Sequence, residues 1–267
     1  MRIPVIAGNW KMNLDRSAAV ALARELRDHA ASSSAAVGGA SGGGAARVEI
    51  GVAPPFPYLE AVRSLLRGTP IWVAGQNVSH EKLGAFTGEV AASMLVDVGC
   101  SHVLVGHSER RHLYGESSDL VGRKLAAALA AGLAPLLCVG ETLAERQAGK
   151  TNAVVLEQLE SGLKGQEEAS LGRLLIAYEP VWAIGTGVNA TPAQAGEVHR
   201  LIREWLGRRF SKAFAAATRI LYGGSVKAEN AAELLAVDDV DGALVGGASL
   251  TAASFLKIVA ACPTRAR

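Results

Sequence analysis

Three side chains that could carry out proton-transfer chemistry each follow a short apolar run. Glu179 comes directly after the run 174–178, His107 follows 102–106, and Lys11 lies in a polar turn after 3–7. A carboxylate at the end of a buried strand could act as a general base, and desolvation there should raise its pKa. A neutral imidazole could donate a hydrogen bond to a carbonyl oxygen, and a fixed ammonium could stabilise developing negative charge.

Each of these side chains also has a purely structural interpretation. A strand-end glutamate can cap a helix or pair with a lysine, and a lone histidine is usually structural. His107 differs because it precedes a short helical segment, whose N-terminal potential disfavours imidazolium. Glu109 could pair with Lys11 or with Arg110, in a structural or a catalytic role. The remaining histidines lack such a setting, and we interpret them as structural or surface residues: His29, His80, His102, His112 and His199.

Two glycine-rich turns follow the last two apolar runs. Gly223-Gly224-Ser225 comes after 219–222, and Gly246-Gly247 comes after 242–245. Glycines let backbone N–H groups approach an anion closely, and paired turns of this kind form phosphate sites in α/β barrels. Either turn alone could be a plain connection, but together they favour a phosphate site.

Other glycine-rich and metal-binding patterns are incomplete. Residues 185–190 match a dinucleotide fingerprint, but the acid required at the end of the next strand is missing, because Glu204 falls within a helical stretch. The chain has no GxxxxGK[ST] loop and no His/Asp/Glu cluster with metal-ligand spacing. We therefore expect neither a cofactor nor a metal.

The elements that must position these side chains alternate regularly. Eight near-continuous apolar runs, predicted as strands, lie at residues 3–7, 48–53, 71–75, 102–105, 135–139, 174–178, 219–222 and 242–245. Stretches predicted as helices lie at residues 18–29, 58–66, 90–98, 118–131, 152–163, 191–209, 228–235 and 252–261. Such apolar strands are typical of a parallel sheet covered on both faces. The pattern predicts one (β/α)8 barrel domain over residues 1–267, with a doubly wound open sheet as the alternative.

The segment 32–46 consists almost entirely of Ser, Ala and Gly. Such a composition is typical of a linker between domains. However, only one βα unit precedes it, and that unit cannot bury a core alone. We interpret 32–46 as a flexible connection between the first helix and the second strand.

Composition argues against several classes of function. A formal net charge of +2 gives no strong attraction to nucleic acid or to membranes. The apolar stretches are shorter than the roughly 20 residues of a membrane span, and the opening run is too short for a signal peptide. Three scattered cysteines, Cys100, Cys138 and Cys262, suit a reducing cytoplasm. We therefore expect a cytoplasmic protein that acts on a small molecule, without nucleic acid or membrane partners.

Six segments together carry a family resemblance over essentially the whole chain. They are Asn9-Trp10-Lys11, Gly84-Ala85-Phe86-Thr87-Gly88-Glu89, Gly106-His107-Ser108-Glu109-Arg110-Arg111, residues 177–187, Tyr222-Gly223-Gly224-Ser225-Val226 and Val245-Gly246-Gly247-Ala248-Ser249-Leu250. In order and spacing they resemble the triosephosphate isomerase family. A glutamate base, a neutral histidine and a closing loop are the known combination of that family.

The resemblance implies an isomerase of glycolysis and gluconeogenesis that interconverts dihydroxyacetone phosphate and D-glyceraldehyde 3-phosphate through an enediolate. It implies Glu179 as base, His107 as electrophile, Lys11 as positive charge and Asn9 as hydrogen-bonding partner, supported by Glu109 and Cys138. Backbone amides of Gly185, Ser225, Gly246 and Gly247 would hold the phosphate. A lid would comprise Val181, Trp182, Ala183, Ile184, Thr186 and Gly187. Loop 76–88, with Phe86 and Thr87, would enter a second subunit of a homodimer, where Thr87 would reach the partner's active site.

Two departures from the family pattern stand out. Segment 32–46 is longer and richer in glycine than usual, and we expect local disorder there without loss of activity. The trailing end of the lid reads Val188-Asn189-Ala190 where lysine-threonine-alanine is common, so the kinetics of the lid could differ. Alternatives are a pentulose-phosphate epimerase, whose metal-binding residues have no counterparts here, and a non-catalytic binding barrel. The presence of Glu179, His107 and Lys11 argues against the latter.

Overall fold

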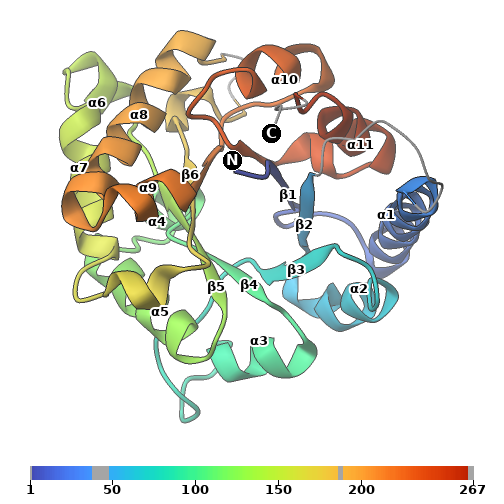
Figure 1. Ribbon diagram of the computed structural model, residues 1–267. Helices are drawn as coiled ribbons and strands as arrows, with labels where there is room; N and C mark the ends of the chain where they lie inside the picture. The colour runs from blue at the N-terminus through green and yellow to red at the C-terminus, as the bar shows by residue number, and fades with distance from the viewer. Residues whose placement is uncertain (1, 38–47, 186–188, 264–267) are drawn as a thin grey trace.

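The computed structural model describes residues 2–37, 48–185 and 189–263. Its parallel strands follow one another in chain order around a closed barrel. Strand β1 (Val5–Asn9) closes the barrel because it pairs with both β2 (Glu49–Ala53) and β8 (Gly242–Val245). Figure 1 shows the helices surrounding this barrel. The predicted (β/α)8 fold is confirmed, and the open sheet is excluded.

Most predicted elements are present within two residues of their expected bounds. The other strands are β3 (Trp72–Gly75), β4 (His102–Val105), β5 (Ala134–Val139), β6 (Leu175–Tyr178) and β7 (Arg219–Tyr222). The helices that follow β2 to β8 include α2 (Leu59–Leu65), α3 (Ala92–Val98), α5 (Ser118–Ala130), α7 (Thr151–Gly162), α8 (Pro192–Arg209), α10 (Ala228–Leu235) and α11 (Ala252–Ala260). As the sequence predicts, α8 begins with a capping box between Thr191 and Gln194.

Several short elements were not predicted from apolar periodicity. They are α6 (Leu143–Gln147), α9 (Lys212–Ala217) and the 3-10 turns η1 (Phe56–Tyr58), η2 (Glu168–Leu171), η3 (Val181–Ala183) and η4 (Gly247–Ser249). Segments of three to six residues are too short to display a helical repeat, so their hydrophobic pattern carries little information.

The first helix corrects one expected boundary. Helix α1 (Arg16–Val37) begins after Asp15, whose carboxylate accepts the N–H of Ala18 at 2.8 Å. It continues through residues 32–37, which were predicted to be part of a flexible connection. Alanine has the highest helix propensity and the first glycine of this segment is Gly38, so no breaker stops the helix earlier. Residues 38–46 of the expected connection lie outside the described residues.

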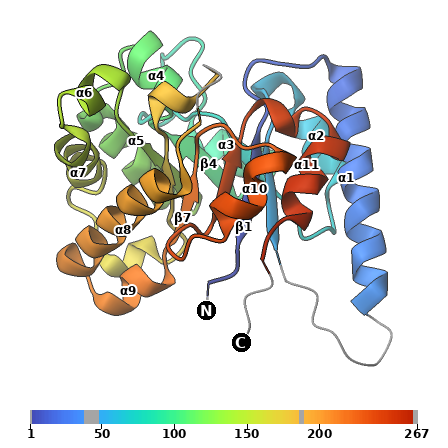
Figure 2. The ribbon, with the colours of Figure 1, turned by 90° about the horizontal axis from the view of Figure 1, so that it is seen from above.

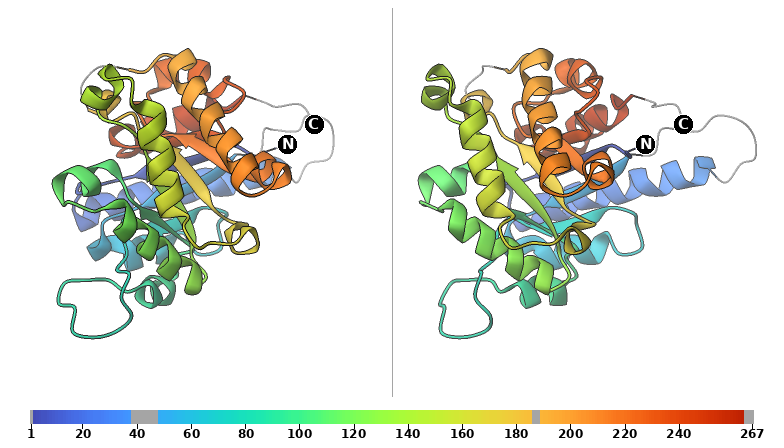
Figure 3. Two further views of the ribbon diagram at one scale, coloured as in Figure 1. Left: turned by 90° about the vertical axis from the view of Figure 1, so that its left-hand side faces the viewer. Right: turned by 60° about the vertical axis from the view of Figure 1, so that its left-hand side comes forward.

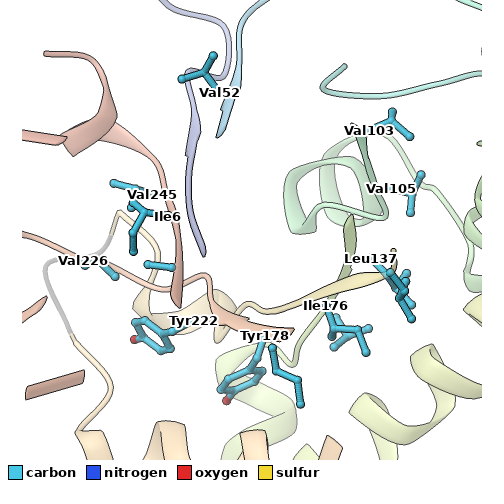
Figure 4. Close-up of a cluster of buried hydrophobic side chains, with 14 of the residues drawn as sticks. Ile6, Val52, Val103, Val105, Leu137, Ile176, Tyr178, Tyr222, Val226 and Val245 are labelled. Atoms are coloured by element: carbon cyan, nitrogen blue, oxygen red, sulfur yellow. The ribbon is translucent and has the colours of Figure 1, made fainter. Parts of the chain in front are cut away.

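Side chains alternate between two cores along each strand. The inner cluster fills the barrel and comprises Val5, Ala7, Ala53, Trp72, Ala74, Leu104, Leu136, Cys138, Leu175, Ala177, Leu221 and Leu244. Figure 4 shows the outer cluster, in which side chains such as Ile6, Leu137 and Ile176 point away from the barrel toward the helices. This double burial explains why apolar residues run almost continuously along the strands.

The same alternation selects the side chains that reach the end of the barrel where the strands terminate, here called the mouth. Asn9 lies two residues beyond Ala7, and Glu179 lies two beyond Ala177, so both continue inward-facing rows. Asn9 belongs to β1 and pairs with Ala53, which corrects the expectation that the strand ends at residue 7.

Figure 2 shows the two ends of the barrel, with α4 (Ser108–Leu113) at the mouth and the start of β1 at the opposite, N-terminal end. Figure 3 shows that the loop between β3 and α3, residues 76–91, stands out from the barrel. Within the described ranges 2–37, 48–185 and 189–263, no helix is both long and apolar enough to cross a membrane.

Candidate active site

Glu179 lies almost fully buried at the mouth, directly after β6. Its backbone N–H donates to the carbonyl of Val139 at 2.7 Å, which ties it to the end of β5. One carboxylate oxygen accepts the backbone N–H of Ser108 at 2.8 Å, and the other lies 3.0 Å from Nε2 of His107. The acid and the imidazole that the sequence singles out are therefore in direct contact.

The electrostatic setting of Glu179 differs from the one expected. Burial raises the pKa of this carboxyl group, but the contact with His107, the Ser108 N–H and the charge of Lys11 lower it, and the net shift is downward. The prediction of a raised pKa is therefore wrong for this arrangement, because sequence alone does not count the donors that face the carboxylate. With a lowered pKa, Glu179 is ionised at neutral pH and able to accept a proton.

His107 caps the N-terminus of α4. Its Nδ1 accepts the backbone N–H of Glu109 at 3.2 Å, so the proton of a neutral ring resides on Nε2 and points toward Glu179. Burial lowers the pKa of His107, whereas the adjacent carboxylate of Glu179 raises it, and the net direction is upward. The expected preference for neutral imidazole is thus opposed while Glu179 stays in contact, although the Glu109 N–H still favours the neutral tautomer.

Lys11 is held in a rarely populated backbone conformation, with a φ of 51°. Its N–H donates to Oδ1 of Asn9 at 3.0 Å, and its carbonyl accepts from Nε2 of Gln76 at 2.8 Å. Its ammonium lies 2.6 Å from the carboxylate of Glu109. Of the two partners left open for Glu109, Arg110 and Lys11, the lysine is the one that forms this contact.

A cavity of about 510 Å³ opens at the mouth, here called the mouth cavity. Its walls include Asn9, Lys11, His107, Glu179, Gly185, Ser225, Gly246 and Gly247. The catalytic candidates and the two glycine turns thus share one space, with the acid–imidazole contact at one side. Gly185 has a φ of 69°, a conformation that glycine adopts at little cost. Such a cavity can hold a small anionic molecule between a base and backbone donors.

The segment leading into the expected lid is anchored by Glu141, which is fully buried. Its carboxylate accepts the indole N–H of Trp182 at 3.0 Å and the hydroxyl of Tyr178 at 3.1 Å. Arg146 adds an ion pair to Glu141 at 3.1 Å and lies 4.9 Å from the Trp182 ring centroid. The N–H of Ser225 donates to the carbonyl of Ala183 at 3.0 Å. These contacts hold Val181–Ala183 in the present position.

Some predicted residues do not line the mouth cavity. Cys138 is fully buried in the inner cluster, and burial together with the charge of Glu179 raises the pKa of its thiol. Phe86 and Thr87 are exposed on the projecting loop 76–91. Of the other lid residues, Thr186 and Gly187 lie outside the described residues, as does Val188 at the trailing end.

The chain is similar to known proteins over nearly its whole length. The family model described as triosephosphate isomerase matches residues 4–262. The chain belongs to the triosephosphate isomerase family. It is 48% identical over 258 residues to the triosephosphate isomerase of Azoarcus sp., covering 97% of this chain and 98% of that protein. It is 49% identical over 258 residues, with the same coverage, to that of Nitrosococcus oceani. It is also 48% identical over 260 residues to the triosephosphate isomerase of Rhodopirellula baltica, covering 97% of this chain and 98% of that protein.

Membership of the triosephosphate isomerase family agrees with the barrel and with a mouth that carries acid, imidazole and ammonium groups. Among the described residues, no group of three or more His, Cys, Asp or Glu side chains is arranged to hold a metal ion.

Sequence reasoning missed two parts of this triosephosphate isomerase site. Glu141 lies two residues after the predicted strand 135–139, but its contacts with Trp182 and Arg146 were not predicted. The signal was present in the capping box from Thr142 to Glu145, which begins α6 and so places Arg146 on that helix. Ser108 was missed because its contribution is a backbone N–H, which no side-chain pattern reveals.

Proposed function

We propose that this chain is an isomerase that interconverts dihydroxyacetone phosphate and D-glyceraldehyde 3-phosphate, with Glu179 as base and His107 as electrophile. The observation that carries the proposal is the 3.0 Å contact between Glu179 and Nε2 of His107 at a cavity also lined by two glycine turns. Proton transfer next to a carbonyl needs a base and a hydrogen-bond donor side by side.

Glu179 accepts a proton from C1 of dihydroxyacetone phosphate, so that the C1–H bond breaks and an enediolate forms. The same carboxylic acid then delivers a proton to C2, which forms the aldehyde. To do so the carboxylate must exchange its contacts with Ser108 and His107 for the substrate carbon. Without substrate, the Glu179 carboxylate is therefore hydrogen-bonded to groups that the substrate displaces.

His107 donates the hydrogen bond from Nε2 to the substrate carbonyl and carries the hydroxyl proton from O1 to O2 of the enediolate. Once substrate separates it from Glu179, the carboxylate no longer raises the pKa of the ring so strongly. The N–H of Glu109 then favours the neutral imidazole. Neutral imidazole suits this role better than imidazolium, which is a stronger acid. The ring has to give a proton to one enediolate oxygen and take one back from the other.

The remaining groups stabilise charge. Lys11 places its ammonium beside the cavity, and Asn9 supports the Lys11 backbone through its side-chain oxygen. The phosphate occupies the side of the cavity lined by Gly185, Ser225 and the Gly246-Gly247 turn, where backbone amides donate to it. Because the N–H of Ser225 donates to Ala183 at present, phosphate binding and lid movement are coupled. Closure excludes water and strengthens the attraction between Lys11 and the enediolate.

The chain acts as a homodimer. Large apolar side chains are exposed near Lys11, on loop 76–91 and at the end of α4: Met12 is 92% exposed, Leu83 69%, Phe86 44% and Leu113 75%. Exposed apolar groups of this kind mark interaction surfaces. Sedimentation analysis should give twice the chain mass, and Phe86→Asp should shift the equilibrium toward monomer. Glycolysis and gluconeogenesis in the cytoplasm are the setting that fits this activity.

An isomerisation assay tests the function directly. The chain, treated with a chelator, should convert glyceraldehyde 3-phosphate, because the proposed mechanism uses no metal. Complete loss of parental activity on chelation would contradict this mechanism. Lys11→Met should lower kcat/KM about 10²-fold by removing the charge that stabilises the enediolate. If the parent chain binds triose phosphates without converting them, it is a binding barrel instead.

A further inference from the structure

Arg111 is a charged side chain at the mouth for which the proposed mechanism has no use. It lies on α4, four residues after His107, and folds back toward the strands. Its Nε donates to the carbonyl of Gly106 at 2.8 Å, Nη2 donates to the carbonyl of Cys138 at 3.2 Å, and Nη1 donates to the hydroxyl of Ser118 at 3.2 Å. The guanidinium is therefore bound to two strand ends and to the start of α5.

The two carbonyls are located where the sheet ladder stops. The register of β4 and β5 runs to Val105, which lies opposite Leu137. The next residues along the two strands, Gly106 and Cys138, present their carbonyls to the same guanidinium. Arg111 thus connects β4 and β5 beyond their last paired residues. Its guanidinium is planar, so the spacing between its N–H donors is fixed.

Both residues adjoin the reacting side chains. Gly106 precedes His107 directly, and Cys138 is close enough to Glu179 for that carboxylate to raise the pKa of its thiol. Glu179 itself is tied to the next residue of β5, through its N–H and the carbonyl of Val139. β5 lies between β4 and β6 in the barrel. The bonds from Arg111 to Gly106 and Cys138, here called the clamp, connect β4 to β5, and the bond from Glu179 to Val139 connects β5 to the end of β6. Together they fix the position of the His107 imidazole relative to the Glu179 carboxylate.

The packing around this clamp is tight. Gly106 has a φ of 71°, and a Cβ placed on it would lie 2.8 Å from Nη2 of Arg111 and 2.8 Å from Val121. Burial lowers the pKa of Arg111, and attraction to neighbouring acidic groups, Glu179 among them, raises it. The Arg111 side chain is partly buried, and desolvation costs its guanidinium more than it would cost an apolar side chain. Its presence calls for a role beyond filling space.

We propose that Arg111 is a positioning residue for the isomerisation, which fixes the separation of His107 and Glu179 by tying the end of β4 to the end of β5. This inference rests on the proposed isomerase activity. Misplacement of reacting groups by about 1 Å can lower a rate about 10²-fold. The clamp acts on the chemical step, so its loss lowers kcat. KM stays nearly unchanged, because the proposed phosphate-binding groups follow β6, β7 and β8 and not β4 or β5.

The test compares Arg111→Met and Arg111→Lys with the parent chain, whose isomerisation is measured first. Failure of the parent to isomerise would overturn the proposed function rather than the clamp. With an active parent, Arg111→Met should lower kcat at least about tenfold with KM within about twofold. Arg111→Lys, which keeps the charge but lacks the fork, should recover only part of kcat.

Ser118→Ala provides the matched control, because it removes the third partner of the guanidinium without touching either carbonyl. It should lower the thermal midpoint slightly and leave kcat unchanged. A purely structural arginine would behave differently: folded Arg111→Met, verified by circular dichroism at the assay temperature, would retain parental kcat with a lowered midpoint, and that result would overturn the proposal. If Arg111→Met does not fold, Arg111→Lys replaces it. A kcat below the parental value would support the proposal, and a parental kcat in folded Arg111→Lys would overturn it.

Discussion

The two ends of the barrel handle buried charge in opposite ways. At the N-terminal end, the fully buried Asp241 is held by Arg2 and Arg203, each at 2.5 Å, and by the N–H of Ile220 at 2.9 Å. At the mouth, the equally buried Glu179 contacts Nε2 of His107 and the N–H of Ser108, which the substrate displaces in the proposed mechanism. Permanent partners turn a buried carboxylate into a structural support, whereas exchangeable ones leave it free to react.

Backbone geometry shows the same contrast. At the mouth, Lys11 keeps a φ of 51°. At the N-terminal end, the Trp72 indole N–H donates to Glu49 at 3.0 Å, its ring stacks on His102 at 4.1 Å, and Gly51 leaves the space that the ring occupies. The left-handed conformation of Lys11 lies beside the mouth cavity, whereas at the N-terminal end the Trp72 side chain is fixed by a hydrogen bond and by ring stacking.

The largest expected effect is at the mouth. Glu179→Gln removes the base and keeps the shape of the side chain, so kcat should fall about 10³-fold or more. The free energy of unfolding should fall only modestly, because the amide loses the attraction that lowers the pKa of Glu179 but is easier to bury than a carboxylate. Steady-state kinetics and urea unfolding measure the two quantities. Parental kcat in this variant would contradict the assignment of the base.

The matching change at the other end should do the reverse. Asp241→Asn leaves Arg2 and Arg203 without their shared charge, so the free energy of unfolding should fall by about 3–5 kcal/mol. Turnover per folded molecule should be unchanged. Asp239→Asn is the milder control, because that carboxylate is 23% exposed. A loss of kcat without a loss of stability in Asp241→Asn would remove the distinction between the two ends.

A pH titration tests the N-terminal end further. Burial, helped by Arg173 and Arg219, lowers the pKa of His102 from 6.5 to about 3, so the folded state keeps this ring neutral while the unfolded state takes up a proton. Its contribution to stability is therefore present above pH 6.5 and declines by about 1.4 kcal/mol per pH unit below it. Urea unfolding between about pH 7 and pH 5 should show a shallower decline for His102→Gln. If the free energy of unfolding declined equally steeply in the parent and in His102→Gln, protonation of His102 would not be the cause of the decline.

The smallest expected effect concerns the outer part of the mouth. The Lys11–Glu109 ion pair is partly exposed, with side-chain exposures of 24% and 43%, so solvent screens it. Glu109→Gln should change kcat/KM by less than about fivefold, or roughly 1 kcal/mol. A loss as large as that of Lys11→Met would show that Glu109 takes a direct part in the chemistry.

The sequence predicted the barrel and the residues of the mouth because both depend on order along the chain. Apolar runs followed by Glu179, His107 and Lys11 place these groups at strand ends once the sheet is parallel. The pKa direction of Glu179 and the clamp of Arg111 depend on contacts across strands, and no spacing in the chain encodes them. The end of α1 was misjudged because serine and alanine fit a helix as well as a linker.

The proposed chemistry is tested most directly by following dihydroxyacetone phosphate in deuterium oxide by proton magnetic resonance. A carboxylate base that holds the substrate proton exchanges it with solvent, so part of the glyceraldehyde 3-phosphate should carry deuterium at C2. Glu179→Gln should lose both isomerisation and exchange. Parental rates in this variant, or rapid isomerisation without deuterium in either product or recovered substrate, would contradict proton transfer through Glu179.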